Sequence, residues 1–211
     1  CKNQEANAIL SSYNLHQYTT AENAMPVQLL TRKFSTSQYH QMLETGILTE
    51  SDRVELIRGE IVEMPAIGRR HASQVRRLNA FFTQHLGDRV IVSPQNPIEL
   101  SDRSEPQPDI ALLNPREDFY ESRHPQPNEV FLIIEVADTT LESDREIKIP
   151  LYAEAQIIEV WLVNLNEQCV EVYRHPQANE YTTIQIFYRG ESLSILAFPE
   201  LAIAVDDLLG R

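Results

Sequence analysis

A continuous apolar run near the middle of the chain limits the possible folds more than any other feature. Residues 130–136 read Val-Phe-Leu-Ile-Ile-Glu-Val, with apolar side chains at consecutive positions. A strand with one face in water usually alternates apolar and polar residues, whereas a strand covered on both faces does not. The run therefore predicts a central strand of a sheet.

Periodicity and turn signals around this run predict an α/β domain with a mixed sheet. Capping-box spacings open two of the helices, at Ser35 with Gln38 and at Ser143 with Glu146, and Pro150 is expected to shorten or kink the second helix. The expected elements are a helix at 35–46, a hairpin at 53–57 and 60–64, a helix at 71–87, strands at 89–93 with 98–100, 109–113 and 130–136, a helix at 143–155, and strands at 157–163, 168–174, 181–188 and 193–196. A closing turn is expected at 201–209. The core order is helix, three strands, helix and strand. An N-terminal hairpin precedes this core, and a C-terminal antiparallel meander follows it.

Length and composition are those of a single globular domain. The chain has 211 residues, of which 42% are hydrophobic and 23% charged. Residues 1–24 show no periodicity and are expected to form a flexible leader, which leaves residues 25–211 as one domain. No run approaches the roughly 18 apolar residues of a membrane helix, and the leader does not resemble a signal peptide. These features favour a cytoplasmic protein that does not enter a membrane.

The net charge of −13 argues against a broad nucleic-acid-binding surface. Proteins that bind nucleic acid neutralise phosphates with clustered lysine and arginine residues. One local exception contains Arg69, Arg70, Arg76 and Arg77. This cluster is either a patch that faces phosphate or an ordinary solvated helix face.

Glu135 is the most informative single residue, because its carboxylate lies inside the apolar run. A buried carboxylate loses hydration and needs compensation. A lysine or arginine could pair with it, a divalent cation could bind it, or the end of the strand could expose it to water. The sequence leaves these three readings open.

Asp109 and Lys148 could complete a site with Glu135. Asp109 stands at the start of a predicted strand, so its carboxylate could lie beside Glu135, and a cation would allow both to stay ionised. Lys148 lies in the helix that follows the central strand, and its long side chain could reach back to these acids. The competing reading is an exposed helix pair between Asp144 and Lys148, which are four residues apart.

Taken in order, several segments resemble the Uma-type restriction endonucleases, a bacterial branch of the PD-(D/E)XK nuclease-like superfamily. The resemblance extends from about residue 34 to the C-terminus. It is carried by VELIRGEIV at 54–62, His71 with its helix, SEPQPDI at 104–110, IEV at 134–136, and Lys148 with Tyr152 ahead of EVWLV at 159–163.

The resemblance implies a restriction-endonuclease-like fold and hydrolysis of phosphodiester bonds of DNA, with a homodimer as the expected assembly. Asp109, Glu135 and the backbone carbonyl of Val136 would bind magnesium or manganese. The superfamily usually places its lysine two residues after the glutamate, where this chain has Ala137, so Lys148 would take that role.

The resemblance also suggests two additional site residues, Glu60 and His71. They would supply a further acid and a phosphate contact or proton carrier, although each also reads as an ordinary surface residue. Two other functions remain open on the sequence: a non-catalytic homodimeric interaction or regulatory protein that keeps the nuclease fold, and hydrolysis of a smaller phosphodiester.

Overall fold

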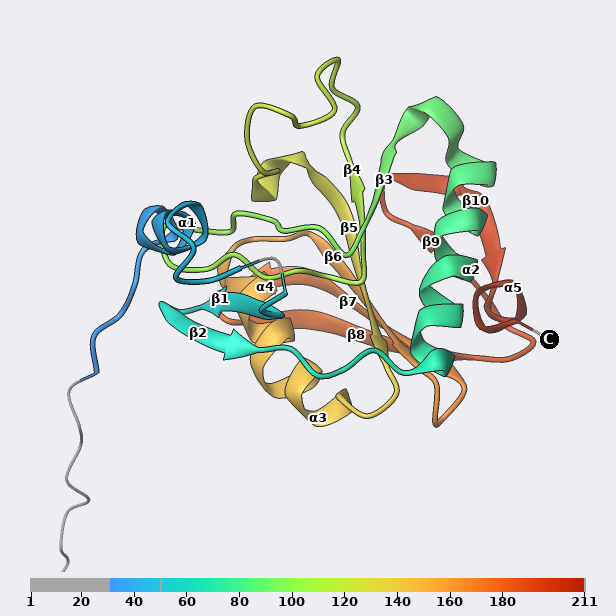
Figure 1. Ribbon diagram of the computed structural model, residues 1–211. Coiled ribbons are helices and arrows are strands. Elements are labelled where there is room, and N and C mark those ends of the chain that lie inside the picture. Colours follow the sequence, from blue (N-terminus) through green and yellow to red (C-terminus); the bar gives the residue numbers. More distant parts are fainter. Residues whose placement is uncertain (1–30, 50, 211) are drawn as a thin grey trace, which may run out of the picture. The chain divides into compact units, whose positions relative to one another are not determined.

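The computed structural model describes residues 31–49 and 51–210 (Figure 1). Residues Lys33–Arg211 form one compact unit. The leader expected at residues 1–24 lies outside the described residues.

The compact unit contains five α-helices and ten strands among the described residues. The helices are α1 (Thr36–Glu44), α2 (Arg69–Leu86), α3 (Leu141–Ser143), α4 (Ile149–Glu154) and α5 (Val205–Leu209). The strands are β1 (Val54–Ile57), β2 (Glu60–Glu63), β3 (Ile91–Pro94), β4 (Ile110–Leu113), β5 (Val130–Ala137), β6 (Glu159–Asn164), β7 (Cys169–Gln177), β8 (Glu180–Tyr188), β9 (Ser192–Ile195) and β10 (Phe198–Ala204).

Six strands form a mixed sheet in the order β3-β4-β5-β6-β7-β8. Only the β5–β6 pair is parallel, and the other four pairs are antiparallel. A parallel pair needs a crossover, which is here the helical segment from Leu141 to Glu154. The predicted α/β class and the order helix, three strands, helix and strand are confirmed.

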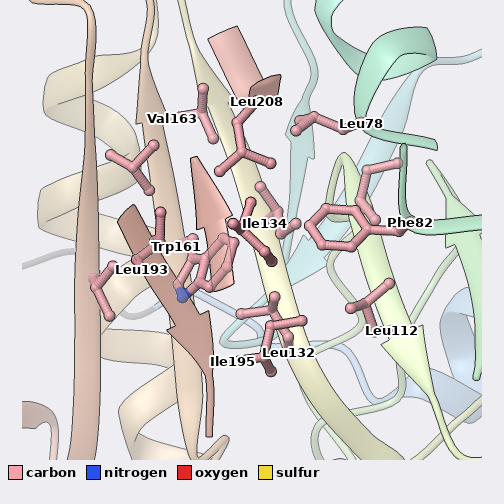
Figure 2. Close-up of a cluster of buried hydrophobic side chains, with 14 of the residues drawn as sticks. Leu78, Phe82, Leu112, Leu132, Ile134, Trp161, Val163, Leu193, Ile195 and Leu208 are labelled. Atoms are coloured by element: carbon pink, nitrogen blue, oxygen red, sulfur yellow. The ribbon is translucent and has the colours of Figure 1, made fainter. Parts of the chain in front are cut away.

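The central position of β5 explains its continuous apolar sequence. Leu132 and Ile134 face a cluster that contains Leu78 and Phe82 of α2 (Figure 2). Ile133 belongs to the cluster on the opposite face, which includes residues of α4. Because helices cover both faces of the sheet (Figure 1), both sets of β5 side chains are buried.

The N-terminal hairpin forms as predicted, with β1 and β2 antiparallel. Arg58 and Gly59 both have positive φ, 47° and 78°, as a two-residue type I′ turn requires. A Cβ atom at residue 59 would lie 3.0 Å from the carbonyl oxygen of Phe34, so close packing as well as φ favours glycine. The Ser35–Gln38 capping box of α1 is also present.

The strand expected at residues 98–100 does not form. The Ile98 N–H donates to the Pro106 carbonyl at 3.0 Å and the Leu100 N–H to the Ser104 carbonyl at 2.9 Å, so this segment pairs with the chain that immediately follows it. Gln95, with φ of 53°, and Pro97, which has no N–H, end β3 before it reaches this segment.

The helix expected at 143–155 begins earlier and is interrupted. Ser143 has helical angles and no side-chain cap, so the second capping box is wrong. A π-helical turn at Asp144–Lys148 separates α3 from α4, and the Ile149 N–H donates to the Asp144 carbonyl across it. Pro150 follows this π turn, in the first turn of α4, and has no N–H to donate to the turn before it.

The C-terminal meander is only partly as predicted. Strands β7 and β8 continue the main sheet, but β9 pairs with β10 in a separate antiparallel hairpin. Residues 201–209, expected to form a turn, contain the end of β10 and the whole of α5. Leu193, Ile203 and Leu208 are buried in the α2 side of the core, and this packing orders the segment.

None of the described helices combines the length and the apolar composition that crossing a bilayer requires.

Phe82→Ala tests the packing of α2 on the sheet. Phe82 is fully buried and its ring lies 6.2 Å from the Trp161 ring, between centroids. The truncation should lower the free energy of unfolding by about 3–5 kcal/mol, because it leaves a cavity in the core. Urea denaturation measures this loss. Phe119→Ala, at a side chain that is largely exposed, is the control and should change stability by less than about 0.5 kcal/mol.

Candidate active site

A cleft of about 970 Å³ opens at the sheet edge where β4 begins and β5 ends. Because β4 and β5 are antiparallel, the start of one strand meets the end of the other. The walls come from β1, the segment before α2, the residues ahead of β4 and the helical crossover. Glu55, His71, Asp109, Glu135 and Lys148 line this cleft.

Asp109 lies immediately before β4 and is held by contacts to α2 and β5. Its Oδ2 accepts a hydrogen bond from the Val136 N–H at 2.9 Å and lies 2.9 Å from His71 Nε2. The Asp109 N–H points toward Glu135 Oε2 at 3.4 Å. The two carboxyl groups expected to be neighbours are therefore brought together.

Glu135 is buried, with 2% of its surface exposed. Its Oε1 accepts a hydrogen bond from the Tyr152 hydroxyl at 2.6 Å and lies 3.1 Å from Lys148 Nζ. The solvent-exposed reading of Glu135 is therefore wrong, and the lysine partner is present. Tyr152 and Lys148 both come from the crossover that joins β5 to β6.

Lys148 is not part of an exposed helix pair. Its side chain is only 14% exposed, and its Nζ also lies 3.5 Å from Glu55 Oε2. The Gln107 N–H donates to that same Glu55 oxygen at 3.1 Å. The ammonium group therefore lies between two buried carboxylates, one from β1 and one from β5.

The cleft holds more buried acidic groups than cationic partners. Burial raises the pKa of Glu135; Lys148 opposes this shift and the charge of Asp109 adds to it. Burial also raises the pKa of Asp144, against a hydrogen bond from Thr140. Burial acts to lower the pKa of Lys148, but the surrounding carboxylates, Glu135 first, outweigh it and raise that pKa. The excess of carboxylates would favour binding of a cation.

His71 stands in the first turns of α2 and reaches Asp109. The hydrogen bond to Asp109 raises the pKa of its imidazole. Its Nδ1 is buried and has no hydrogen-bond partner among the described residues. A buried nitrogen without a partner suits a hydrogen bond to an enclosed water molecule.

The Val136 carbonyl faces the same side of β5 as the Asp109 carboxylate. The Ala137 carbonyl accepts a hydrogen bond from the Leu165 N–H, on the β6 side. Backbone groups alternate sides along a strand, so those of Val136 face β4, as its N–H bond to Asp109 indicates. Together with Asp109 and Glu135 this carbonyl makes a set of oxygen donors that suits Mg²⁺ or Mn²⁺.

The carboxylate cluster consists of Glu55, Asp109, Glu135 and Asp144 around Lys148. Two sets of predicted residues do not join it. Glu60 of β2 is exposed and pairs with Lys33, and it does not line the cleft. The arginine cluster lies exposed along α2, and Arg70 pairs with Asp138 at 2.8 Å. The basic patch and the cleft meet at the start of α2, since His71 and Gly68 line the cleft.

Sequence reasoning missed Glu55, Asp144 and the role of Tyr152. Glu55 lies in the strand Val-Glu-Leu-Ile, in which all four residues are buried. A glutamate inside an apolar strand is the signal that identified Glu135, and it would have identified Glu55 as well. Asp144 gave no comparable signal, because the π turn that buries it was not predictable from the spacing.

The Uma2 family model, described as "Putative restriction endonuclease", matches residues 36–206. The chain belongs to this family. Uma2 membership supports a nuclease and confirms the family resemblance of the sequence. The matched range includes every residue of the carboxylate cluster and His71.

A solved structure agrees with the Uma2 fold of this chain. It is a "putative nuclease belonging to DUF820 from Anabaena variabilis ATCC 29413", with a TM-score of 0.61 and 20% sequence identity. The alignment covers 79% of this chain and 95% of that one. At this identity the likeness establishes the fold, which is nuclease-like. No curated protein matches the chain.

Lys148→Met and Glu135→Gln should have opposite effects on stability. Removing the ammonium leaves Glu135 and Glu55 buried without their cation, which should lower the free energy of unfolding by about 3–5 kcal/mol. Glu135→Gln removes one charge from an acidic cluster and leaves Lys148 paired with Glu55. It should leave stability unchanged or raise it.

Urea denaturation of both variants measures these differences. Lys33→Met is the matched control, because it removes an exposed ion pair with Glu60 and should cost no more than about 1 kcal/mol. A large loss of stability in Glu135→Gln would show that Glu135 serves mainly as a structural partner of Lys148.

Proposed function

We propose that this chain is a metal-dependent endonuclease that hydrolyses phosphodiester bonds of DNA. The observation that carries the proposal is the meeting of Asp109, Glu135 and Lys148 in one cleft, with 3.1 Å between Glu135 Oε1 and Lys148 Nζ. Asp109, Glu135 and the Val136 carbonyl would hold Mg²⁺ or Mn²⁺. When bound, the cation would polarise the phosphate and lower the pKa of a water molecule.

Lys148 supplies the positive charge that the reaction needs near phosphorus. Negative charge increases on the phosphoryl oxygens in the transition state, and a fixed ammonium stabilises it. Position 137, where the superfamily usually has its lysine, holds a fully buried alanine. In this chain the lysine lies instead in the helical crossover after β5, and its ammonium group reaches the Glu135 carboxylate.

His71 acts as a contact to the phosphate or as a carrier of a proton. Asp109 orients its ring through Nε2 and favours the protonated imidazole. The other nitrogen, Nδ1, is the atom with no partner among the described residues. Glu60 has no part in this proposal, because its carboxylate is exposed and pairs with Lys33.

DNA would approach along the basic face of α2. Arg69 and Arg76 are seven residues apart on this helix, so they lie on the same face. The helix starts at the cleft, so Arg69, in its first turn, lies nearest to the cleft on this face. His71 is on the opposite side of the helix, which faces the sheet. With a net charge of −13 on the whole chain to repel phosphate, binding depends on few basic contacts.

One observation favours the second candidate, a non-catalytic homodimer that retains the fold. Edge strand β8 exposes Ile184, Ile186 and Tyr188 at alternate positions, so they share one face. Apolar side chains on an edge strand suit contact with a second copy of the chain. A chain that is dimeric by light scattering and nicks no DNA with either metal would support this candidate. A cytoplasmic location belongs to both candidates.

Purified protein should nick supercoiled plasmid DNA with Mg²⁺ or Mn²⁺ and stop when excess chelator is added. Asp109→Asn should lower the nicking rate by roughly 10²- to 10³-fold, because it removes a metal ligand and the partner of His71. Gel electrophoresis of the nicked product measures the rate. Glu60→Gln is the control and should nick as the wild type does. Activity that survives both the chelator and Asp109→Asn would exclude the proposed mechanism.

Replacing Arg69 and Arg76 by alanine should weaken DNA binding and its dependence on salt. Each lost phosphate contact should reduce the slope of log K against log[salt] by about 1. Fluorescence anisotropy of a labelled duplex at several salt concentrations measures both quantities. Arg89→Ala, beyond the other end of α2 and paired with Glu200, is the control. An unchanged slope in the double variant would show that this face of α2 does not contact DNA.

A further inference from the structure

A second cluster of possible metal ligands lines the cleft and shares no residue with the carboxylate cluster. It consists of His40 of α1, Glu105 in the segment between β3 and β4, and His124 in the loop between β4 and β5. One ligand atom from each lies within 4.8 Å of the others. All three residues line the cleft.

The Glu105 carboxylate is buried, with 2% of its surface exposed, and the basic side chains beside it are histidines. His40 Nε2 lies 2.8 Å from Glu105 Oε2, and His124 Nε2 lies 4.0 Å from Glu105 Oε1. Among residues 31–49 and 51–210, no lysine or arginine pairs with Glu105. By contrast, Glu135 pairs with Lys148 and Glu159 with Arg174. A buried carboxylate whose neighbours are imidazoles is well suited to bind a metal ion.

Backbone hydrogen bonds fix the segments that carry two of these ligands. The Glu105 N–H donates to the Leu56 carbonyl at 2.7 Å, which holds Glu105 against β1. The Glu99 N–H donates to the Pro125 carbonyl at 3.0 Å, which ties the His124 loop to the segment that contains Glu105. The ligand positions are therefore built into the fold.

We propose that His40, Glu105 and His124 bind a divalent transition-metal ion of the Zn²⁺ class. Imidazole nitrogens suit zinc and its neighbours, whereas Mg²⁺ prefers oxygen ligands in an octahedron. Zinc–nitrogen bonds of about 2.1 Å place tetrahedral ligand atoms roughly 3.4 Å apart. The observed separations of 2.8 Å and 4.0 Å lie on either side of this value, so small side-chain rotations complete the site.

The metal would join three segments that are far apart in the sequence. Residues 40, 105 and 124 come from α1 and from two separate loops, and the metal would hold them together along one wall of the cleft. Binding to the folded state alone stabilises it. Three protein ligands leave a fourth position of a tetrahedral ion for water or another group.

The experiment titrates ZnCl₂ and CoCl₂ into the full chain. Zn²⁺ should raise the melting temperature of the wild type, and Co²⁺ should develop visible d–d absorption bands. His124→Asn, at a partly exposed side chain, should lower Zn²⁺ affinity by at least about 10- to 100-fold, the loss that outer-shell changes alone produce. His40→Asn combined with His124→Asn should abolish both signals.

The control replaces two other surface histidines, His85 and His175, by asparagine and should bind as the wild type does. Asp109→Asn should also keep the Zn²⁺ and Co²⁺ signals, because the carboxylate cluster takes no part in this site. No signal in the wild type, or equal binding by the His40 and His124 double variant, would overturn the proposal. Since DNA cleavage is not measured, failure here is distinguishable from failure of the proposed nuclease function.

Discussion

The burial of the Glu135 carboxylate at the end of β5 is the interaction on which the candidate active site depends. An ionised group in the central strand of a sheet costs several kcal/mol unless other groups compensate for its lost hydration. Here Lys148, 3.1 Å away, and the Tyr152 hydroxyl, 2.6 Å away, provide that compensation. Both come from the crossover between β5 and β6, so the connection that a parallel pair requires also supplies the partners of the buried acid.

Sheet topology brings the remaining groups to the same edge. The antiparallel pairing of β4 and β5 places Asp109 beside the end of β5, and α2 packs so that His71 reaches Asp109. Strand β1 of the N-terminal hairpin contributes Glu55, whose carboxylate also lies near Lys148 Nζ. The result is an acidic cluster in which a single lysine serves two carboxylates, and this excess of negative charge is the physical reason for proposing a cation there.

One cleft thus combines two chemically different sets of possible metal ligands. The set around Asp109 and Glu135 offers oxygen atoms, which hard cations such as Mg²⁺ prefer. The set around Glu105 offers two imidazole nitrogens, which favour zinc and similar ions. Because the two sets differ in preferred metal and share no residue, each can be altered by substitution without removing the other.

Elements with strong local periodicity, and the acids that interrupt it, were predictable from the order of residues alone. Local sequence determines the apolar run of β5, the apolar face of α2 and the Arg58–Gly59 turn. Asp109 and Glu135 were recognisable because each is an acidic residue next to or within an apolar strand. Three facts required the folded chain: Lys148 pairs with Glu135 and Glu55, Glu60 stays outside the cleft, and His40 and His124 meet at Glu105. The Lys148 pairs alone join residues 13 and 93 positions apart. Such contacts form through the packing of strands and helices, which local spacing does not encode.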